Sequence, residues 1–248
     1  MRQFRRSSRS LSLSGYFPPG VKWLIIVNVA VYVLIGLFGR PIQNDLLILH
    51  LIPVTVVHNF TLYQLVTYLF LHASISHLVF NMLALWMFGL PLEQTWGTRR
   101  FLKFYFLCGI GAGICDVAFH AALGQWGTNT IGASGAIFGL LMAYGVLFPD
   151  QQVLMGFLFP IKAKYMVMIY GAIELYMAFA VNDGISNIAH LGGMAFGYVY
   201  LKGRLPSMRL GKRMPDLGDA FRQWKMRRAK KKFQVYMSKH DRRGPWVN

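Results

Sequence analysis

Polar side chains able to take part in nucleophilic catalysis stand near the heads of three long apolar stretches. Ser134 opens a run of small and apolar residues that continues to about Phe148, and His190 lies near the start of another. His77 and Asn81 head a third run. A serine hydroxyl is a poor nucleophile unless a base removes its proton, and a neutral imidazole suits that task near pH 7. The three polar positions therefore predict one shared site, provided that the elements carrying them meet.

Each of these side chains also has a purely structural interpretation. Serine is common where membrane helices pack, and hydrogen bonds alone can hold a histidine in a helix bundle. His77 and Asn81 can cap or bridge helices. An ionisable residue in an apolar segment is nonetheless a functional candidate by default. We favour a functional site because Ser134 and His190 occur together with closely spaced glycines.

The charge distribution identifies the class of protein. The chain has 248 residues, of which 55% are hydrophobic and 14% charged, and its net charge is +17. Basic residues gather at the two ends and in short connecting segments, so long stretches carry almost no charge. This pattern is typical of a multi-pass membrane protein and not of a nucleic-acid-binding protein.

We predict an all-α membrane protein built as a bundle of six transmembrane helices. The predicted helices cover residues 21–38, 77–92, 101–123, 131–148, 165–181 and 187–201. Residues 39–76 form a long connection between the first two helices, with Arg40 as their only basic residue. With so few basic residues the connection should lie outside. Because it is also apolar for its length, we expect it to be partly embedded in the outer leaflet.

Basic residues set the expected orientation and boundaries. Arginines near the start, basic clusters before the third and fifth helices, and Lys202 with Arg204 after the sixth place both termini in the cytoplasm. We divide the chain into a basic N-terminal segment (1–20), a membrane domain (21–203) and a basic tail (204–248). The N-terminal segment also resembles an organelle transit peptide. The tail is either an amphipathic helix on anionic lipids or a solvated, partly disordered segment.

The predicted topology brings the polar positions to one face of the membrane. The second, fourth and sixth helices enter from outside, so His77, Ser134 and His190 should lie at similar shallow depth. His77 and Asn81 are four residues apart and share a helix face. Glycines four residues apart let helices approach closely. They are Gly135 and Gly139 in the fourth helix and Gly193 and Gly197 in the sixth. With these backbones close, Ser134 and His190 can reach hydrogen-bond distance.

Three motifs resemble the signature sequences of rhomboid intramembrane serine proteases, and they occur in the family's order. They read His-Leu-Val-Phe-Asn at 77–81, Gly-Ala-Ser-Gly-Ala-Ile-Phe-Gly at 132–139 and Ala-His-Leu-Gly-Gly-Met-Ala-Phe-Gly at 189–197. The resemblance covers about residues 21–203. Gly132, the first residue of the second motif, joins the glycines expected to allow close packing near the site.

The resemblance implies a role for each motif residue. Ser134 is expected to be the nucleophile, and His190 its general base and then its general acid. His77, Asn81 and the backbone N–H of Ser134 would form the oxyanion hole, where oriented donors stabilise the tetrahedral intermediate. Because no carboxylate is apparent beside His190 in the sequence, we expect a Ser–His dyad rather than a triad.

The sequence departs from the family's best-known members in two places. Phe138 stands where some members have a tyrosine that stacks on the histidine, so the stacking should survive without the hydroxyl contact. Tyr63 and Gln64 occupy the place of a Trp-Arg pair in the first external connection. That change puts the connection's membrane anchoring in doubt, but not the chemistry.

Other polar residues in or near the apolar segments receive local roles. Asp116 and His120 are four residues apart and are expected to pair with each other. His72 is expected to support the long connection by hydrogen bonding. Glu174 lies in the middle of the fifth helix, and no partner is predicted for it.

The resemblance implies an endopeptidase that cleaves other membrane proteins near the outer end of a transmembrane segment. Expected partners are the lipid bilayer and substrates with a helix-destabilised transmembrane segment, because a helix must unwind before its peptide bond reaches Ser134. No cofactor and no nucleic acid is expected. The expected location is a bacterial plasma membrane, with an organelle membrane as the alternative. The alternative function is a catalytically silent, client-binding relative; the lack of inverted repeats argues against a transporter.

Overall fold

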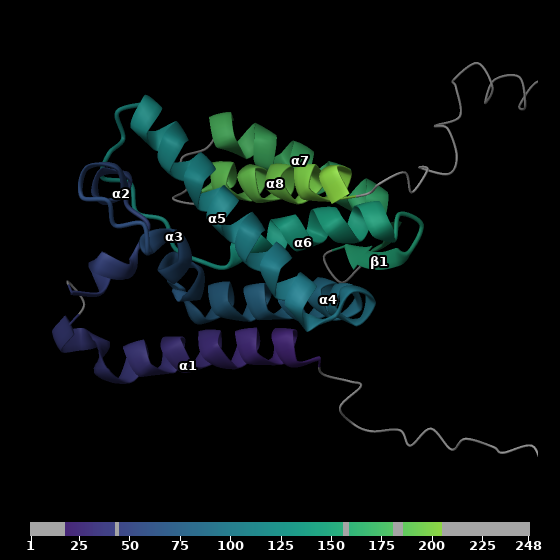
Figure 1. Cartoon of the computed structure of the whole chain (residues 1–248), viewed down its shortest axis with the longest axis horizontal. Helices are drawn as coiled ribbons and strands as arrows, with labels where there is room; N and C mark the ends of the chain where they lie inside the picture. Colours follow the sequence, from purple (N-terminus) through teal and green to yellow (C-terminus); the bar gives the residue numbers. More distant parts are fainter. Residues whose placement is uncertain (1–17, 43–44, 156–158, 181–185, 205–248) are drawn as a thin grey trace, which may run out of the picture. The chain divides into compact units, whose positions relative to one another are not determined.

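The computed structural model describes residues 18–42, 45–155, 159–180 and 186–204, and these are mostly helical (Figure 1). The long helices are α1 (Pro19–Ile42), α4 (Ile75–Trp96), α5 (Thr98–Ala122), α6 (Ser134–Leu147), α7 (Ala163–Ala180) and α8 (Asn187–Arg204). Each lies where the sequence predicted a helix. Residues 1–17 and 205–248, which hold most of the basic N-terminal segment and of the basic tail, lie outside the described residues.

The helices identify an integral membrane protein. Three helices in the described part of the chain are long and apolar enough to cross a membrane, at Pro19–Phe38, Ile75–Trp96 and Thr98–Ala122. The apolar helix α6 has 14 residues, which is about 21 Å of helix against about 30 Å of hydrocarbon. A helix this short cannot reach both surfaces of the bilayer, so its first residue can lie below the membrane surface.

One segment departs from the predicted all-α class. Strand β1 (Gln152–Met155) pairs antiparallel with β2 (Phe159–Lys162), and Val153 lies opposite Ile161. The sequence predicted a loop here, because strands of four residues give almost no alternating pattern and Pro160 argues against a strand. The hairpin lies between α6 and α7, away from the ends of the helices that carry the predicted site residues.

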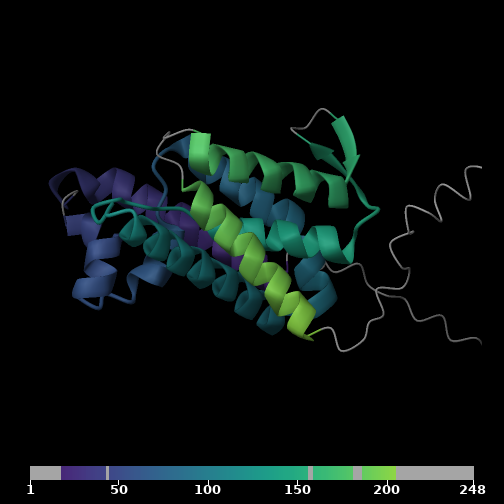
Figure 2. The same cartoon turned by 90° about the horizontal axis from the view of Figure 1, so that it is seen from above.

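α6 packs against α4, α5, α7 and α8 (Figure 1, Figure 2). Its sequence is apolar on every side, as expected of a buried helix. Gly193 of α8 lies on the backbone of α6, because a Cβ added there would overlap the carbonyl oxygen of Gly135. One turn further on, a Cβ at Gly197 would stand 3.1 Å from the Gly139 carbonyl oxygen. These glycines let the two helices meet backbone to backbone.

The start of α1 is held by a carboxylate near the end of α4. Glu93 is 2% exposed, and its two carboxylate oxygens accept hydrogen bonds of 2.7 Å from the N–H groups of Gly20 and Val21. The hydroxyl of Thr98, at the start of α5, donates a 2.6 Å hydrogen bond to the same carboxylate. The first N–H groups of a helix lack acceptors within it and carry positive partial charge, so a carboxylate there is stabilising. One side chain thus joins α1, α4 and α5.

The predicted connection between the first two long helices contains short helical turns. They are η2 (Asp45–Leu49), α2 (Pro53–His58), α3 (Gln64–Thr67) and η3 (Tyr68–Phe70). Gln64 is buried at their centre, and its Nε2 donates a 3.0 Å hydrogen bond to the carbonyl oxygen of Ile48. Its Oε1 accepts hydrogen bonds from the N–H of Ile52 and the hydroxyl of Thr55. Gln64, one of the two residues that depart from the family pattern here, therefore joins separate parts of the connection by hydrogen bonds.

Candidate active site

The backbone before Ser134 is fixed by contacts with the connection between α1 and α4. Leu51 and Thr130 form an isolated antiparallel bridge with backbone hydrogen bonds of 3.1 and 3.0 Å. The N–H of Gly132 donates a 2.9 Å hydrogen bond to the carbonyl oxygen of Tyr68. Gly132 has a φ of +123°, which lies outside the helical region and is accessible mainly to glycine. The helix therefore begins at Ser134, three residues later than the sequence predicted.

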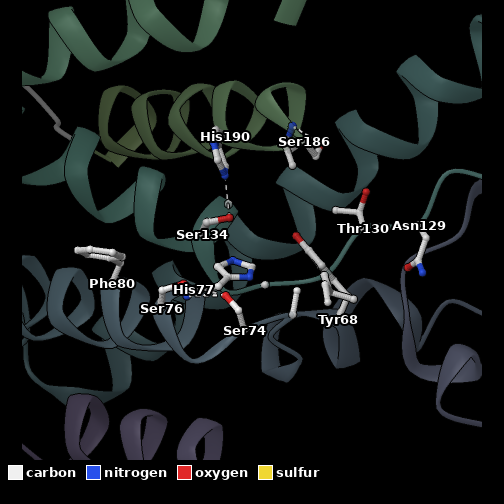
Figure 3. Close-up of a pocket in the computed structure, with 15 residues that line it drawn as sticks. Tyr68, Ser74, Ser76, His77, Phe80, Asn129, Thr130, Ser134, Ser186 and His190 are labelled. Atoms are coloured by element: carbon white, nitrogen blue, oxygen red, sulfur yellow. Dashed lines mark hydrogen bonds between the residues drawn. The ribbon is translucent and has the colours of Figure 1, made fainter. Parts of the chain in front are cut away.

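The close contact of α6 and α8 brings Ser134 and His190 together (Figure 3). The Nε2 atom of His190 lies 2.7 Å from Oγ of Ser134. Ser134 is the first residue of α6, and His190 lies in the first turn of α8. The ring of Phe138 stacks on the imidazole, with centroids 4.2 Å apart and planes inclined by 12°. This confirms the prediction that phenylalanine keeps the stacking contact at this position.

A carboxylate stands beside His190, contrary to the prediction. The Nδ1 atom of His190 lies 2.8 Å from Oε2 of Glu174 in α7, and both residues are buried. His190 is thus the partner of Glu174, for which the sequence had predicted none. α7 and α8 are consecutive and pack on each other, so a residue in the last two turns of α7 can face the start of α8. An ionisable residue within the apolar part of each of two consecutive helices was the signal that could have revealed this pair.

His77 and Asn81 occupy different positions relative to Ser134. His77 lines the same cavity as Ser134 (Figure 3), and its ring packs on Gly132, where an added Cβ would stand 2.8 Å from Nε2. The hydroxyl of Ser74 caps α4 by accepting a 3.1 Å hydrogen bond from the N–H of His77. Asn81 is buried, and its Nδ2 donates a 2.8 Å hydrogen bond to the carbonyl oxygen of His77. The structure brings His77 to the cavity and leaves the Asn81 amide bonded to its own helix.

His72 lies in the connection just before α4, next to another histidine. Its ring is buried and packs edge-on against the ring of His77, with centroids 5.0 Å apart. Neither ring nitrogen of His72 makes a hydrogen bond of ordinary geometry within the described residues. Burial, together with the neighbouring His77, lowers the pKa of His72 from 6.5 to about 4. Its ring is therefore neutral at neutral pH and acts by packing.

Ser134, His77 and His190 face one cavity of about 460 Å³. Thr130 and Ser186 also line it (Figure 3). This volume lies within the range of about 300–1,000 Å³ that is usual for ligand sites. A hydroxyl that is hydrogen-bonded to an imidazole in such a cavity can attack a carbonyl carbon placed beside it. The geometry is therefore one that acyl transfer would require.

A second polar cluster holds the start of α8. Oδ1 of Asp116 accepts a hydrogen bond from the hydroxyl of Ser186, and Nδ1 of His120 lies 3.3 Å from the same oxygen. The predicted pairing of Asp116 with His120 is confirmed, whereas the contact with Ser186 was not predicted. Ser186 also accepts hydrogen bonds from the N–H of Ala189, at Oγ, and from the N–H of His190, at its carbonyl oxygen. The cluster thus fixes the turn that carries His190.

Known proteins with similar sequences share one family name. A family model described as the rhomboid domain matches residues 59–206. The chain is 38% identical over 136 residues to Rhomboid protease GluP of Bacillus subtilis, covering 55% of this chain and 25% of that protein. It is 31% identical over 144 residues to RHOMBOID-like protein 1 of Arabidopsis thaliana, covering 58% of this chain and 35% of that protein.

A mitochondrial relative shows the same likeness. The chain is 34% identical over 135 residues to Rhomboid protein 1, mitochondrial, of Saccharomyces cerevisiae, covering 53% of this chain and 38% of that protein. The aligned part thus makes up between about a quarter and about two fifths of each of these three relatives. The family-model match, which runs from residue 59 to residue 206, includes the helices that carry the candidate site.

Proposed function

Because the chain belongs to the rhomboid family, we propose that it is an intramembrane serine endopeptidase that cuts transmembrane segments of other membrane proteins. The observation that carries this proposal is the 2.7 Å contact between Oγ of Ser134 and Nε2 of His190, beside a cavity in a helical membrane protein. The name of one relative, a rhomboid protease of Bacillus subtilis, supports the same function.

The proposed reaction begins when Nε2 of His190 takes the hydroxyl proton of Ser134 as Oγ attacks the carbonyl carbon of the peptide. The electron pair of the carbonyl π bond moves to its oxygen and gives a tetrahedral intermediate. His190 then donates the proton to the leaving nitrogen as the C–N bond breaks, which leaves an ester on Ser134. Water attacks this ester while His190 takes its proton. Collapse of the second intermediate returns that proton to Ser134 and releases the carboxylic acid product, which then loses its proton to water.

Donors for the oxyanion come from the start of α6 and from α4 in this proposal. The N–H of Ser134 belongs to the first turn of α6, where backbone donors have no acceptor within the helix and the helix dipole favours negative charge. The side chain of His77 is supported as a second donor by its place in the cavity. Asn81 is the third: one hydrogen of its Nδ2 bonds the His77 carbonyl, and the amide carries a second that can be donated to the oxyanion. Such a donor contributes about 10²–10³ in kcat.

We infer a bundle of six membrane helices, α1 and α4 to α8, in which the short α6 begins below the membrane surface, with the connection between α1 and α4 partly embedded in the outer leaflet. His77, Ser134 and His190 each lie in the first turn of a helix, which supports a site near one face of the membrane. Basic residues at the opposite helix ends support cytoplasmic termini. They are Arg99, Arg100, Lys103, Lys162, Lys164 and Lys202. We accordingly propose that residues 21–203 form the membrane domain, with a basic segment on either side. We propose a bacterial plasma membrane as its location.

The proposed substrates follow from the cost of exposing backbone groups to lipid. A peptide bond has to leave its helix to reach Ser134, and each unsatisfied backbone group in hydrocarbon costs several kcal/mol. Glycine or proline beyond the cut weakens the substrate helix in advance and lowers that cost. Small residues at the cut let the substrate backbone come close to Ser134 and His190, at the starts of α6 and α8. The bilayer and such helix-destabilised segments are therefore the proposed partners.

Labelling of the purified full chain in detergent with a fluorophosphonate tests this assignment. The probe bonds to an activated serine oxygen, so the wild type should label and Ser134→Ala should not. His190→Ala should slow labelling by at least about 10³-fold, because the hydroxyl loses its base. Ser76→Ala is the matched control, since Ser76 lines the same cavity and contacts Ser74 rather than a histidine.

Two outcomes would contradict the proposal in different ways. A folded wild type that never labels would favour a client-binding protein without protease activity. Labelling that survives Ser134→Ala but disappears in another serine variant would place the nucleophile elsewhere. Labelling that persists in Ser76→Ala and is lost in both Ser134→Ala and His190→Ala supports the proposed pair.

A further inference from the structure

A buried carboxylate contacts the edge of His190 that faces away from Ser134. Oε2 of Glu174 lies 2.8 Å from Nδ1 of the imidazole, and Nε2 of the same ring lies 2.7 Å from Oγ of Ser134. The three side chains come from three helices, α7, α8 and α6. They form a continuous series of carboxylate, imidazole and hydroxyl.

We propose that Glu174 is a positioning residue for His190, so that this chain works with a Ser134–His190–Glu174 triad rather than the predicted Ser–His dyad. The inference rests on the proposed function, because it gives Glu174 a task in that same site. Glu174 acts through His190 and touches neither the nucleophile nor the peptide in this arrangement.

The first task of Glu174 is to select the tautomer of His190. An ionised carboxylate can only accept hydrogen bonds, so a carboxylate 2.8 Å from Nδ1 requires the ring hydrogen to be on that nitrogen. Nε2 then carries the lone pair and faces the hydroxyl of Ser134. This is the tautomer that can remove the serine proton, and the other one presents an N–H to the hydroxyl instead.

The second task is electrostatic. When His190 takes the proton of Ser134 it becomes a cation, and its attraction to the neighbouring carboxylate then exceeds that of the neutral ring. An interaction that strengthens as the transition state forms raises kcat. The pair is buried, where charges interact more strongly than in water. The contact therefore favours the charged intermediate state of the base over its resting state.

A simpler interpretation is that Glu174 only ties α7 to α8. An ionisable residue in an apolar helix needs a partner whatever its function, and His190 supplies one. The two interpretations differ in what they predict. A tie between helices affects the melting temperature, whereas a positioning residue also sets the tautomer of His190 and the rate of the bond-forming step.

Inactivation kinetics of the full chain in lipid separate the two interpretations. A fluorophosphonate gives both kinact, the rate of bond formation, and KI, the affinity for the probe. Glu174→Gln keeps the size of the side chain but carries no charge and no longer selects one tautomer, so kinact should fall roughly 10²- to 10⁴-fold while KI stays within about threefold. Glu174→Asp keeps the charge and should recover part of kinact.

Glu93→Gln is the matched control for loss of a buried carboxylate. Glu93 bonds the start of α1 and lies near the end of α4 opposite to His77. This variant should melt at a lower temperature and should keep kinact within about twofold of wild type at a temperature where it is folded. A fall in kinact similar to that of Glu174→Gln would mean that general loosening explains both.

The tautomer itself gives a second readout that needs no turnover. The chain has seven histidines, and the ¹⁵N signals of His190 are those lost from a histidine-labelled His190→Phe sample in lipid. Wild type should show a protonated Nδ1 and a bare Nε2 at neutral pH, and Glu174→Gln should show a mixture of tautomers. If Glu174→Gln does not fold, the comparison of wild type with Glu174→Asp takes its place.

The outcomes distinguish this inference from the proposed function. A folded Glu174→Gln with unchanged kinact and an unchanged His190 signal would overturn the role of Glu174 and leave the protease proposal intact. A wild type that does not react with the probe would overturn the protease proposal. The ¹⁵N comparison would then still show whether Glu174 orients His190.

Discussion

At the scale of single residues, the proposed site depends on how one imidazole ring is held. Two contacts are made by its nitrogens, Nε2 to Ser134 and Nδ1 to Glu174. The third is made by its face, on which Phe138 stacks. The edge contacts set which nitrogen carries the hydrogen, and the face contact limits rotation of the ring. The orientation of His190 is therefore determined by side chains from two neighbouring helices.

The stacking contact predicts a graded effect at Phe138. An aromatic contact of this kind contributes about 0.5–1.5 kcal/mol, so Phe138→Leu should slow fluorophosphonate labelling about two- to tenfold. Phe138→Tyr keeps the ring and should label within about twofold of wild type. Labelling time courses measure both, with a melting curve to show that each variant is folded. Equal rates for Phe138→Leu and wild type would show that the stacking does not hold the imidazole.

At the scale of helices, the site depends on the contact between α6 and α8. Gly193 and Gly135 meet backbone to backbone, and the pair of helices carries Ser134 and His190 at the same end. Because backbone atoms cannot turn aside as a flexible side chain does, the spacing of the two helices is sensitive to a single methyl group. The distance from Oγ to Nε2 follows from that spacing.

Gly193→Ala should therefore separate α6 from α8 and move Ser134 away from His190. The new Cβ overlaps the Gly135 carbonyl, so one helix must shift, and a misplacement of about 1 Å can cost about 10²-fold in rate. We expect labelling to fall by at least about 10²-fold. Gly36→Ala, in α1, is the control, since nothing lies within 4 Å of its added Cβ and a helical alanine is favourable. Normal labelling of Gly193→Ala would mean that the two helices can adjust without moving Ser134 from His190.

At the scale of the whole molecule, the described helices are joined at two distant places. Near the site, the connection between α1 and α4 bonds the segment before α6, through Leu51 with Thr130 and Tyr68 with Gly132. Near the other end of α4, Glu93 bonds the start of α1. The first set of contacts shapes the cavity, whereas the second holds an outer helix in place. Stability and activity should therefore respond differently to changes at the two places.

Replacing Glu93 tests the second of these places. Glu93→Gln puts an amide NH₂ where a carboxylate oxygen accepted a hydrogen bond, so one backbone donor at the start of α1 loses its acceptor. Hydrogen bonds to charged groups contribute about 1.5–3 kcal/mol each, so the free energy of unfolding should fall by about 2 kcal/mol. Thr98→Val removes one of the three donors to this carboxylate and should cost about 1 kcal/mol. Melting curves in detergent measure both, and an unchanged midpoint for Glu93→Gln would show that α1 is held by packing alone.

Residue types and their spacing predicted where the long helices lie and which residues carry the candidate chemistry. Long apolar runs, basic residues at their ends and glycines four residues apart are local signals, because membrane solubility and close helix packing depend on residue type and spacing. Ser134 and His190 were predictable on this basis, whereas the stacking of Phe138 was predicted from the resemblance to rhomboid proteases. The pairing of Asp116 with His120 was predictable for the same reason, since both residues lie on one helix.

The tertiary structure alone decided which residues meet across helices. The contact of Glu174 with His190 depends on how α7 is rotated about its axis, and no spacing within one helix reports that rotation. The hydrogen bonds from the start of α1 to Glu93 join residues more than seventy positions apart in the sequence. The start of α6 at Ser134 depends on the φ of Gly132 and on its bond to Tyr68, which come from a different part of the chain. Local sequence patterns predict helices, but which side chains contact each other across helices depends on how the helices pack.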